Sequence, residues 1–287
     1  MKKPDIFDLG LTADLQMWQQ SPLNRRRFLK MGAATLVLLL AGCQSDTEAD
    51  SEGTAVTTTN NSETANTTST EGEVCVETIP SETAGPYPAD GSQASNQTLN
   101  ALALAGIVRS DIRTSLGTGN TAEGIPTTIE LTLVNTNDGC TPLANHALYA
   151  WHCDRDGNYS MYSQAVVDED YCRGVQESDS EGKLTFITVF PACYTGRWPH
   201  VHFEVYPSLA EATDASDVIH TSQLALPEAV CDAAYKVEGY EQSVRNLGQL
   251  SLATDNVFRD GVNSQMATVT GDTENGYVVR LTVGVPA

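Results

Sequence analysis

The segment Thr128-Ile-Glu-Leu-Thr-Leu-Val134 decides the fold class of this 287-residue chain. Its apolar residues alternate with polar ones, so every second side chain points to the same side, as in a β-strand with one buried face. Its isoleucine, valine and threonine residues also favour extended backbone. We therefore expect a strand here, and the rest of the sequence indicates how many others accompany it.

Five further stretches show apolar alternation and β-propensity. These stretches are residues 102–108, 147–153, 184–189, 201–206 and 277–283. Gly, Asn, Asp and Pro cluster between them, as is typical of turns. Only residues 228–237 favour a short helix, and we interpret 235–260 as long loops. Many short strands separated by turns predict an all-β sandwich or barrel.

The first 43 residues have the pattern of an export signal. The stretch Asn24-Arg-Arg-Arg-Phe-Leu-Lys30 fits the twin-arginine type, with Arg25 and Arg26 as the pair. The apolar run that follows is shorter than the about 20 residues that a membrane span needs. It ends in Leu-Ala-Gly-Cys43, which resembles a bacterial lipobox and predicts lipidation of Cys43. An uncleaved anchor helix is the alternative.

Residues 44–74 are rich in Ser, Thr, Asn and Glu and contain almost no large apolar residue. Such a segment cannot bury enough surface to offset the entropy of ordering, so we expect a flexible tether. Residues 75–287 then form the folded domain. The sequence predicts a protein exported by the twin-arginine route and held on the cell envelope through a lipid anchor and this tether.

The exported part of the chain is strongly acidic. Without residues 1–43 it has 10 Lys and Arg against 34 Asp and Glu. This charge argues against nucleic acid as a partner, and against a membrane partner other than the lipid anchor itself. Solubility of an exported domain is the simplest explanation of the charge.

The cysteines indicate disulfides. An even number remains if Cys43 is lipidated, and cysteines in exported domains commonly pair. They are Cys75, Cys140, Cys153, Cys172, Cys193 and Cys231. The sequence does not choose among the possible pairings, but we expect most of them to be paired. A zinc or iron–sulfur site is disfavoured because no CxxC pair exists.

The chemistry gathers in Pro191-Ala-Cys-Tyr-Thr-Gly-Arg-Trp-Pro-His-Val-His-Phe-Glu-Val205. On a strand, His200 and His202 point to the same face, and imidazole is the commonest metal ligand in proteins. A phenol has a pKa of about 10 and is normally neutral. Beside a highly charged cation, Tyr194 can bind as phenolate. The alternative is two partly exposed polar histidines.

Three segments, in chain order, resemble the intradiol ring-cleavage dioxygenases, the catechol and protocatechuate 3,4-dioxygenase family. Glu82-Thr-Ala-Gly-Pro-Tyr-Pro88 resembles the family's early ETEGPYY-type segment. Trp151-His-Cys-Asp-Arg-Asp-Gly-Asn-Tyr-Ser160 resembles its WHxxxxGxYS segment. The third segment runs from Arg173-Gly-Val-Gln176 to His202. The resemblance spans residues 75–287 and implies an antiparallel β-sandwich with long loops.

Carried over residue by residue, the resemblance implies a non-haem ferric iron, Fe(III), held by two tyrosines and two histidines. These ligands are Tyr159, Tyr194, His200 and His202. Either Tyr159 or Tyr194 can be the base that accepts a substrate proton. Arg197 has the permanent charge to stabilise an anionic intermediate, and a structural ion pair is the alternative role for it.

The resemblance also implies substrate contacts for Gln176 and Tyr87. We expect Trp151 and Trp198 to pack in the core or at its rim. His152 is out of phase with Trp151 on its strand, so we expect a structural role for it. The acidic residues that we expect in solvated loops are Asp154, Asp156 and Asp168–Asp170.

The implied reaction uses O2 to cleave a catechol-type ring between its two hydroxylated carbons, giving a muconate-type diacid. The partners would be a small aromatic diol and O2. Two departures from the family, a short stretch between Tyr194 and His200 and the presence of Cys193, leave catechol, protocatechuate and hydroxyquinol open. The alternative is a non-catalytic surface β-sandwich lipoprotein that binds an aromatic or polymeric ligand.

Overall fold

The structure, a computed structural model, describes residues 75–95 and 98–287. The predicted export signal, the lipidated Cys43 and the tether at 44–74 lie outside these residues and stay predictions. Within the described residues, we find no helix that is both long and apolar enough to cross a membrane.

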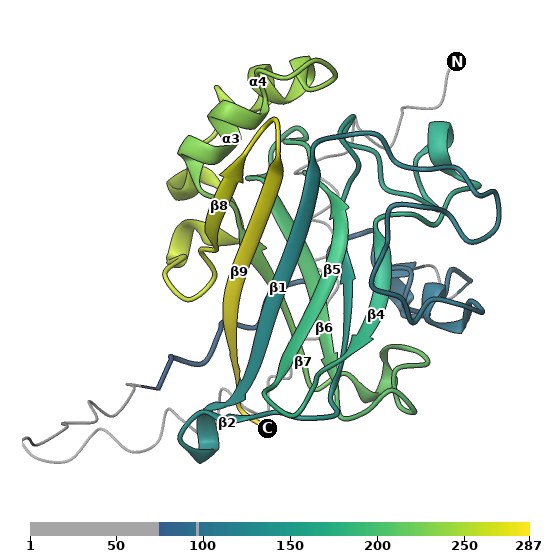
Figure 1. The fold of residues 1–287 in the computed structure, drawn as a ribbon, viewed down its shortest axis with the longest axis vertical. Coiled ribbons are helices and arrows are strands. Elements are labelled where there is room, and N and C mark those ends of the chain that lie inside the picture. Colours follow the sequence, from purple (N-terminus) through teal and green to yellow (C-terminus); the bar gives the residue numbers. More distant parts are fainter. Residues whose placement is uncertain (1–74, 96–97) are drawn as a thin grey trace, which may run out of the picture. The chain divides into compact units, whose positions relative to one another are not determined.

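Two β-sheets pack face to face (Figure 1). In the first sheet, β1 (Pro126–Asn135) pairs antiparallel with β2 (Thr141–Pro142) and β5 (Lys183–Val189). It pairs in parallel with β9 (Gly276–Val285), which in turn pairs antiparallel with β8 (Thr268–Asp272). The parallel pair of β1 and β9 is an exception to the predicted antiparallel arrangement.

The second sheet is antiparallel throughout. Its strands lie in the order β4 (Arg173–Glu177), β3 (Ala147–Trp151), β6 (His200–Tyr206) and β7 (His220–Ala225). The all-β sandwich predicted from the sequence is therefore confirmed. The strands predicted at 128–134, 147–153, 184–189, 201–206 and 277–283 correspond to β1, β3, β5, β6 and β9.

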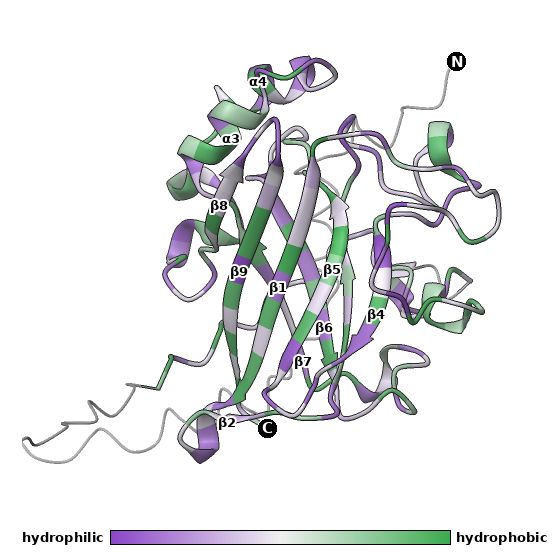
Figure 2. Ribbon diagram, in the orientation of Figure 1, coloured by the Kyte–Doolittle hydropathy of each residue, from purple (hydrophilic) through white to green (hydrophobic). Residues whose placement is uncertain are grey.

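The apolar alternation determines which side chains lie between the sheets. Hydrophobic and polar positions alternate along β1 and β9 (Figure 2). One cluster of buried residues fills the space between the sheets and includes residues from both. From β1 it takes Ile129, Leu131 and Leu133, and from β6 it takes Val201, Phe203 and Val205. Burial of each such side chain contributes about 1.5–3 kcal/mol.

The strand predicted at 102–108 is wrong. Its first two residues belong to a short 3-10 helix, Ala101–Ala103, and its last two begin an extended segment, 107–112. Part of that segment exchanges backbone hydrogen bonds with Val175 of β4, and the rest with Ile187 of β5. It thus bridges edges of the two sheets, and because its hydrogen bonds divide between them it belongs to neither ladder.

The helix predicted at 228–237 is confirmed as α3 (Glu228–Ala234). The loops predicted at 235–260 are wrong in part, because α4 (Glu241–Leu247) and the 3-10 helices η7 (Leu252–Thr254) and η8 (Phe258–Asp260) lie there. Helices this short give little periodicity and depend on tertiary contacts.

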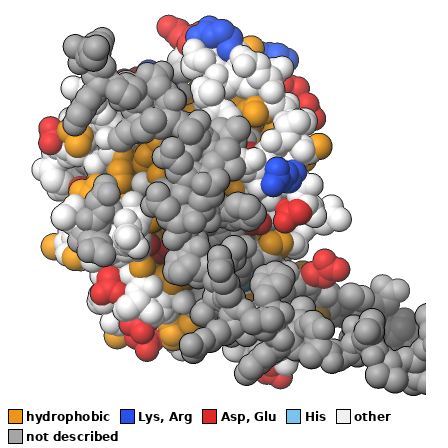
Figure 3. Space-filling view, turned by 180° about the vertical axis from the view of Figure 1, so that it is seen from behind, with side chains coloured by type: hydrophobic (Ala, Val, Ile, Leu, Met, Phe, Trp, Pro, Cys, Tyr) orange, Lys and Arg blue, Asp and Glu red, His pale blue; other side chains and the backbone are white. Residues whose placement is uncertain are grey.

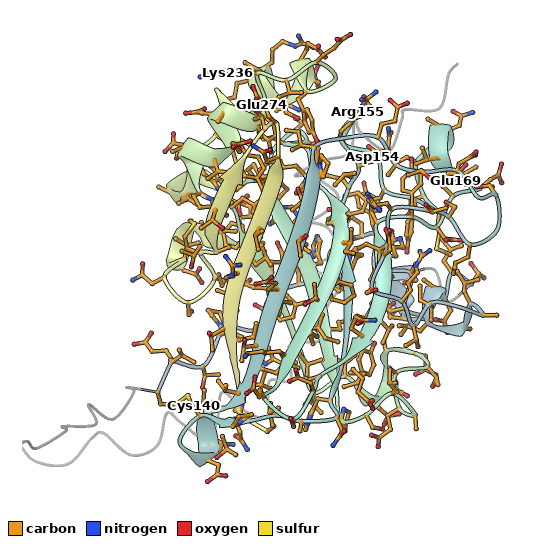
Figure 4. The ribbon with its side chains drawn as sticks, viewed as in Figure 1. Cys140, Asp154, Arg155, Glu169, Lys236 and Glu274 are labelled. Carbon is orange, nitrogen blue, oxygen red and sulfur yellow. A yellow bond between two sulfur atoms is a disulfide. The ribbon has the colours of Figure 1, made fainter. Side chains whose placement is uncertain are left out.

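The expectation that most cysteines are paired is wrong for the described residues. One disulfide joins Cys75 to Cys140, which Figure 4 places at the end of the molecule opposite Asp154. The four free, buried thiols are Cys153, Cys172, Cys193 and Cys231. Burial raises the pKa of each of these thiols, which keeps them protonated and chemically quiet.

Candidate metal centre

The two faces of β6 differ in character. Val201, Phe203 and Val205 point into the core between the sheets, while His200 and His202 point to the outer side, where loops cover the sheet. All seven residues of β6 are buried. The prediction that both histidines share one face is therefore confirmed, and partial exposure of these histidines is excluded.

The two imidazoles meet through their Nε2 atoms, which are 3.0 Å apart. The Nδ1–H of His200 donates to the carbonyl oxygen of Trp198, so its Nε2 carries a lone pair. The ring of Trp151 stacks on His202 with centroids 4.9 Å apart. Burial is the main cause that lowers the pKa of both histidines. Both are neutral at pH 7, as metal ligands must be.

Tyr159 reaches this point from the loop after β3. Oδ1 of Asp154 accepts the backbone N–H groups of Asp156 and Asn158, at 3.0 and 2.8 Å, and so shapes the turn. The Tyr159 hydroxyl then lies 3.5 Å from Nε2 of His200.

The expectation that Asp154 and Asp170 are solvated is wrong. Both are buried. Asp154 is held in the turn before Tyr159, where its Oδ2 also accepts the Tyr171 hydroxyl. Asp170 forms an ion pair with Arg109 at 3.3 Å. These partners replace the water that the two carboxylates would otherwise need.

Tyr194 comes from the segment between β5 and β6, with its hydroxyl 3.4 Å from Nε2 of His200 and its ring packed edge-to-face with that of Tyr159, centroids 5.7 Å apart. Gly157 has a φ of +86°, and a Cβ at this position would lie 3.4 Å from Cβ of Tyr194. On the other side, two residues of α4 hold the backbone of Cys193: Ser243 Oγ accepts its N–H and Asn246 Nδ2 donates to its carbonyl. A helix that the sequence did not predict therefore positions Tyr194.

We call Tyr159, Tyr194, His200 and His202 the ligand set. Donor atoms bound at about 2.1 Å to one ion lie roughly 3.0–3.4 Å apart when the angle between them is right or tetrahedral. The three separations from Nε2 of His200, which are 3.0, 3.4 and 3.5 Å, are close to this spacing. The residues therefore fit a metal ion held by two nitrogen and two oxygen donors.

The chemistry of the donors indicates the charge of that ion. Burial, with a further contribution from Tyr194, raises the pKa of Tyr159 well above its ordinary value. A phenolate at this position therefore needs a cation beside it. The described residues contain no group of three His, Cys, Asp or Glu side chains that could hold a metal ion. A metal at this site would therefore depend on the two tyrosines as donors.

Arg197 lies in a fully buried ion pair. Its Nε is 3.0 Å from Oδ2 of Asp255, and its Nη2 donates to Oε1 of Gln223 at 2.6 Å. The structural ion pair considered as an alternative role for Arg197 is therefore present. Its charge still acts on the ligand set, because it contributes to the lowered pKa of His200 and His202.

Sequence reasoning missed Gln223 and Asp255. Gln223 is directly opposite His202 in the pairing of β6 with β7. Asp255 lies beside the 3-10 helix η7, where we had predicted a loop. The sequence offered no signal for either residue, because only the structure shows that Gln223 is buried and therefore needs a partner.

The remaining predicted residues divide into two groups. Tyr87 stacks on Tyr159 with ring centroids 4.7 Å apart, so it lies against the ligand set. Gln176 does not: its side chain lines a groove formed with β1, β5 and β9. Trp198 and Trp151 are buried, as expected. His152 is structural, since its Nε2 contacts Oγ1 of Thr188 across the sandwich at 2.7 Å.

No protein-family model matches this sequence, and no curated protein matches it. Its structure is similar to that of an intradiol ring-cleavage dioxygenase from Tetranychus urticae. The two are 23% identical with a TM-score of 0.52, over 63% of this chain and 88% of that chain. The dioxygenase domain of a carbohydrate-binding fusion protein from Streptomyces sp. SirexAA-E is 19% identical, with a TM-score of 0.45, over 73% of this chain and 98% of that chain.

The similarity to the Tetranychus urticae enzyme shows the fold. The chain has the β-sandwich fold of the intradiol ring-cleavage dioxygenases, which confirms at the level of the fold the resemblance seen in three sequence motifs.

Proposed function

We propose that this protein is a non-haem Fe(III) dioxygenase that cleaves a catechol-type ring between its two hydroxylated carbons. Both atoms of O2 enter the product, a muconate-type diacid. The observation that carries the proposal is the convergence of four donors from three separate segments, with both tyrosine hydroxyls within 3.5 Å of Nε2 of His200. Ferric iron, when bound, would draw electron density from both catechol oxygens and make the ring reactive toward O2.

The two histidines act as fixed neutral donors. The Trp198 carbonyl orients His200, and the Trp151 ring stacks on His202. Such supporting contacts keep a ligand's lone pair aimed at one point. Their buried position also excludes water from this side of the site.

The two tyrosines differ in their freedom to move. Tyr159 is buried beneath Tyr87, whereas Tyr194 is only partly buried. We therefore assign to the Tyr194 hydroxyl oxygen the role of accepting a proton from the substrate, and to Tyr159 that of a permanent ligand. The sequence left this choice open, and the difference in burial supports the assignment.

Arg197 supplies a fixed positive charge. Asp255 and Gln223 hold its guanidinium, so it needs no rearrangement when negative charge develops on the substrate. The substrate contact proposed for Tyr87 follows from its stacking on Tyr159.

Export is a separate part of the proposal. The twin-arginine route carries folded proteins, so this domain can take up iron before it leaves the cytoplasm. Lipidation of Cys43 would then hold it at the envelope.

Metal analysis and oxygen uptake test the function together. We expect about one iron per chain, a visible absorption band from tyrosinate bound to ferric iron, and O2 consumption with catechol, protocatechuate or hydroxyquinol. Mass spectrometry should identify a diacid product. A colourless protein that holds only zinc would contradict the proposal, and a semialdehyde product would show cleavage outside the two hydroxylated carbons.

A further inference from the structure

Residues 80–87 cross the outer face of the second sheet beside the ligand set. The backbone N–H of Glu82 donates to the carbonyl of Thr221 at 2.9 Å. The Gln223 side chain donates to the carbonyl of Thr83, also at 2.9 Å. At the far end of the segment, Tyr87 stacks on a member of the ligand set. Glu82 therefore lies in the segment that runs from β7, beside Gln223, to Tyr87 at the ligand set, and we call this segment the cover of the candidate site.

The Glu82 side chain is half-buried and held from one side. Its Oε1 accepts from Nε2 of Gln265 at 3.4 Å, and the same Nε2 lies 3.1 Å from the carbonyl oxygen of Gln223. This amide thus links Glu82 to the strand next to His202. Burial, followed by the charge of Asp260, raises the pKa of Glu82 to about 7.

The charges around Glu82 are mostly negative. The described side chains whose charge acts on it are Asp260, Arg197 and Asp255. Arg197 and Asp255 form an ion pair at 3.0 Å, so their charges largely offset each other at a distance. Asp260 is exposed on η8. When Glu82 is ionised, this part of the cover therefore carries excess negative charge.

Figure 3 views the molecule from the side opposite to that of Figure 1. Among the described residues on that face, Lys and Arg side chains are visible in few places.

A like-charged substituent held within a few ångströms of a half-buried carboxylate is repelled by on the order of 1 kcal/mol or more, because the local dielectric constant is below that of water. Such repulsion lowers the affinity for the like-charged ligand, and this alone gives selectivity even if no contact favours the competing ligand.

We infer that Glu82 determines the substrate selectivity of the proposed dioxygenase. Its carboxylate, reinforced by Asp260, disfavours catechols that carry a ring carboxylate and favours those whose substituent is neutral or cationic. The inference rests on the proposed function and narrows its substrate class.

The test compares three catechols whose substituents at C4 are neutral, anionic and cationic: 4-methylcatechol, 3,4-dihydroxybenzoate and 3,4-dihydroxybenzylamine. For each we would measure kcat/KM by oxygen uptake at pH 8, where Glu82 is mostly ionised, and at pH 6. We expect Glu82→Gln to raise the ratio for dihydroxybenzoate over methylcatechol about tenfold at pH 8. The wild-type ratio should also be higher at pH 6 than at pH 8. The ratio for dihydroxybenzylamine over methylcatechol should change in the opposite direction in both comparisons.

Two control variants separate charge from shape. Glu82→Asp keeps the charge and should stay within about threefold of the wild-type ratio. Glu274→Gln removes an exposed carboxylate from the turn between β8 and β9, labelled in Figure 4, and should leave the ratio unchanged. If Glu82→Gln leaves the ratio unchanged, or Glu82→Asp changes it equally, the inference is wrong.

Binding measured under argon keeps this inference distinct from the proposed function. If iron-loaded protein cleaves none of the three catechols, the proposed function fails. Calorimetric titration of the same catechols still tests Glu82, and equal affinities of the wild type for dihydroxybenzoate and methylcatechol would overturn the selectivity inference.

Discussion

The two faces of β6 have nearly the same burial and opposite chemistry. On the inner face, Val201, Phe203 and Val205 pack against the first sheet. On the outer face, His200 and His202 are equally buried but lie under loops that also carry Tyr159 and Tyr194. The comparison shows that a polar face of a sheet can be fully buried when a second layer of residues covers it. In this protein that layer also positions the donor atoms.

The largest effect that we expect comes from the outer face, in Tyr194→Phe. Loss of the hydroxyl removes a ligand and the proposed base, so turnover should fall about 10²- to 10⁴-fold, and the visible band should shift or bleach. The free energy of unfolding should change little, because the aromatic ring remains. Spectra, oxygen uptake and chemical denaturation measure the three quantities.

Tyr162→Phe is the matched control for that variant. Tyr162 lies in the same loop layer, but its hydroxyl accepts the backbone N–H of Ala89 at 2.8 Å rather than joining the ligand set. It should keep the visible band. Equal loss of colour in the two variants would mean that the layer as a whole, not the Tyr194 donor, supports the site.

The inner face should respond in the reverse way to Phe203→Ala. Phe203 is fully buried between the sheets, so its truncation should lower the free energy of unfolding by about 3–5 kcal/mol. Folded molecules should keep the iron and the visible band, because Phe203 points away from the ligand set. Phe203→Leu should cost less. Loss of the band at unchanged stability would contradict the separation of the two faces.

The smallest effect concerns pH and His152, a histidine between the sheets. Burial is the main cause that lowers its pKa from 6.5 to about 4. Below pH 6.5 the unfolded chain therefore binds a proton on His152, whereas His152 in the folded chain stays neutral until the pH falls to about 4. The free energy of unfolding should then fall by about 2 kcal/mol between pH 7 and pH 5 from this group.

Denaturation of the wild type and of a non-titrating variant under the same conditions measures this dependence, because the contributions of His200 and His202, whose pKa values are lowered too, are common to both proteins. His152→Gln keeps hydrogen-bonding atoms but does not titrate, so its stability should vary less over the same range. The His220 pKa is also lowered, and that contribution is common to both proteins. An identical slope in the variant would show that His152 is not the titrating group.

Sequence predicted most strands because alternation is a local property. Residues 128–134 and 201–206 alternate whatever surrounds them, and the shared face of His200 and His202 follows from strand geometry alone. Prediction failed where a segment depends on distant partners. Residues 107–112 divide their backbone hydrogen bonds between two sheets, and α4 is too short to show its periodicity.

The candidate site shows the same division. The sequence by itself determined the order and types of the four proposed ligands, because motif spacing is written along the chain. Only the tertiary structure decided that Tyr159 and Tyr194 converge on His200, that Gln223 and Asp255 hold Arg197, and that Gln176 points elsewhere. The physical reason is that these relations depend on how loops fold over the outer face of one sheet. Their contacts join residues tens of positions apart, and no local pattern records them.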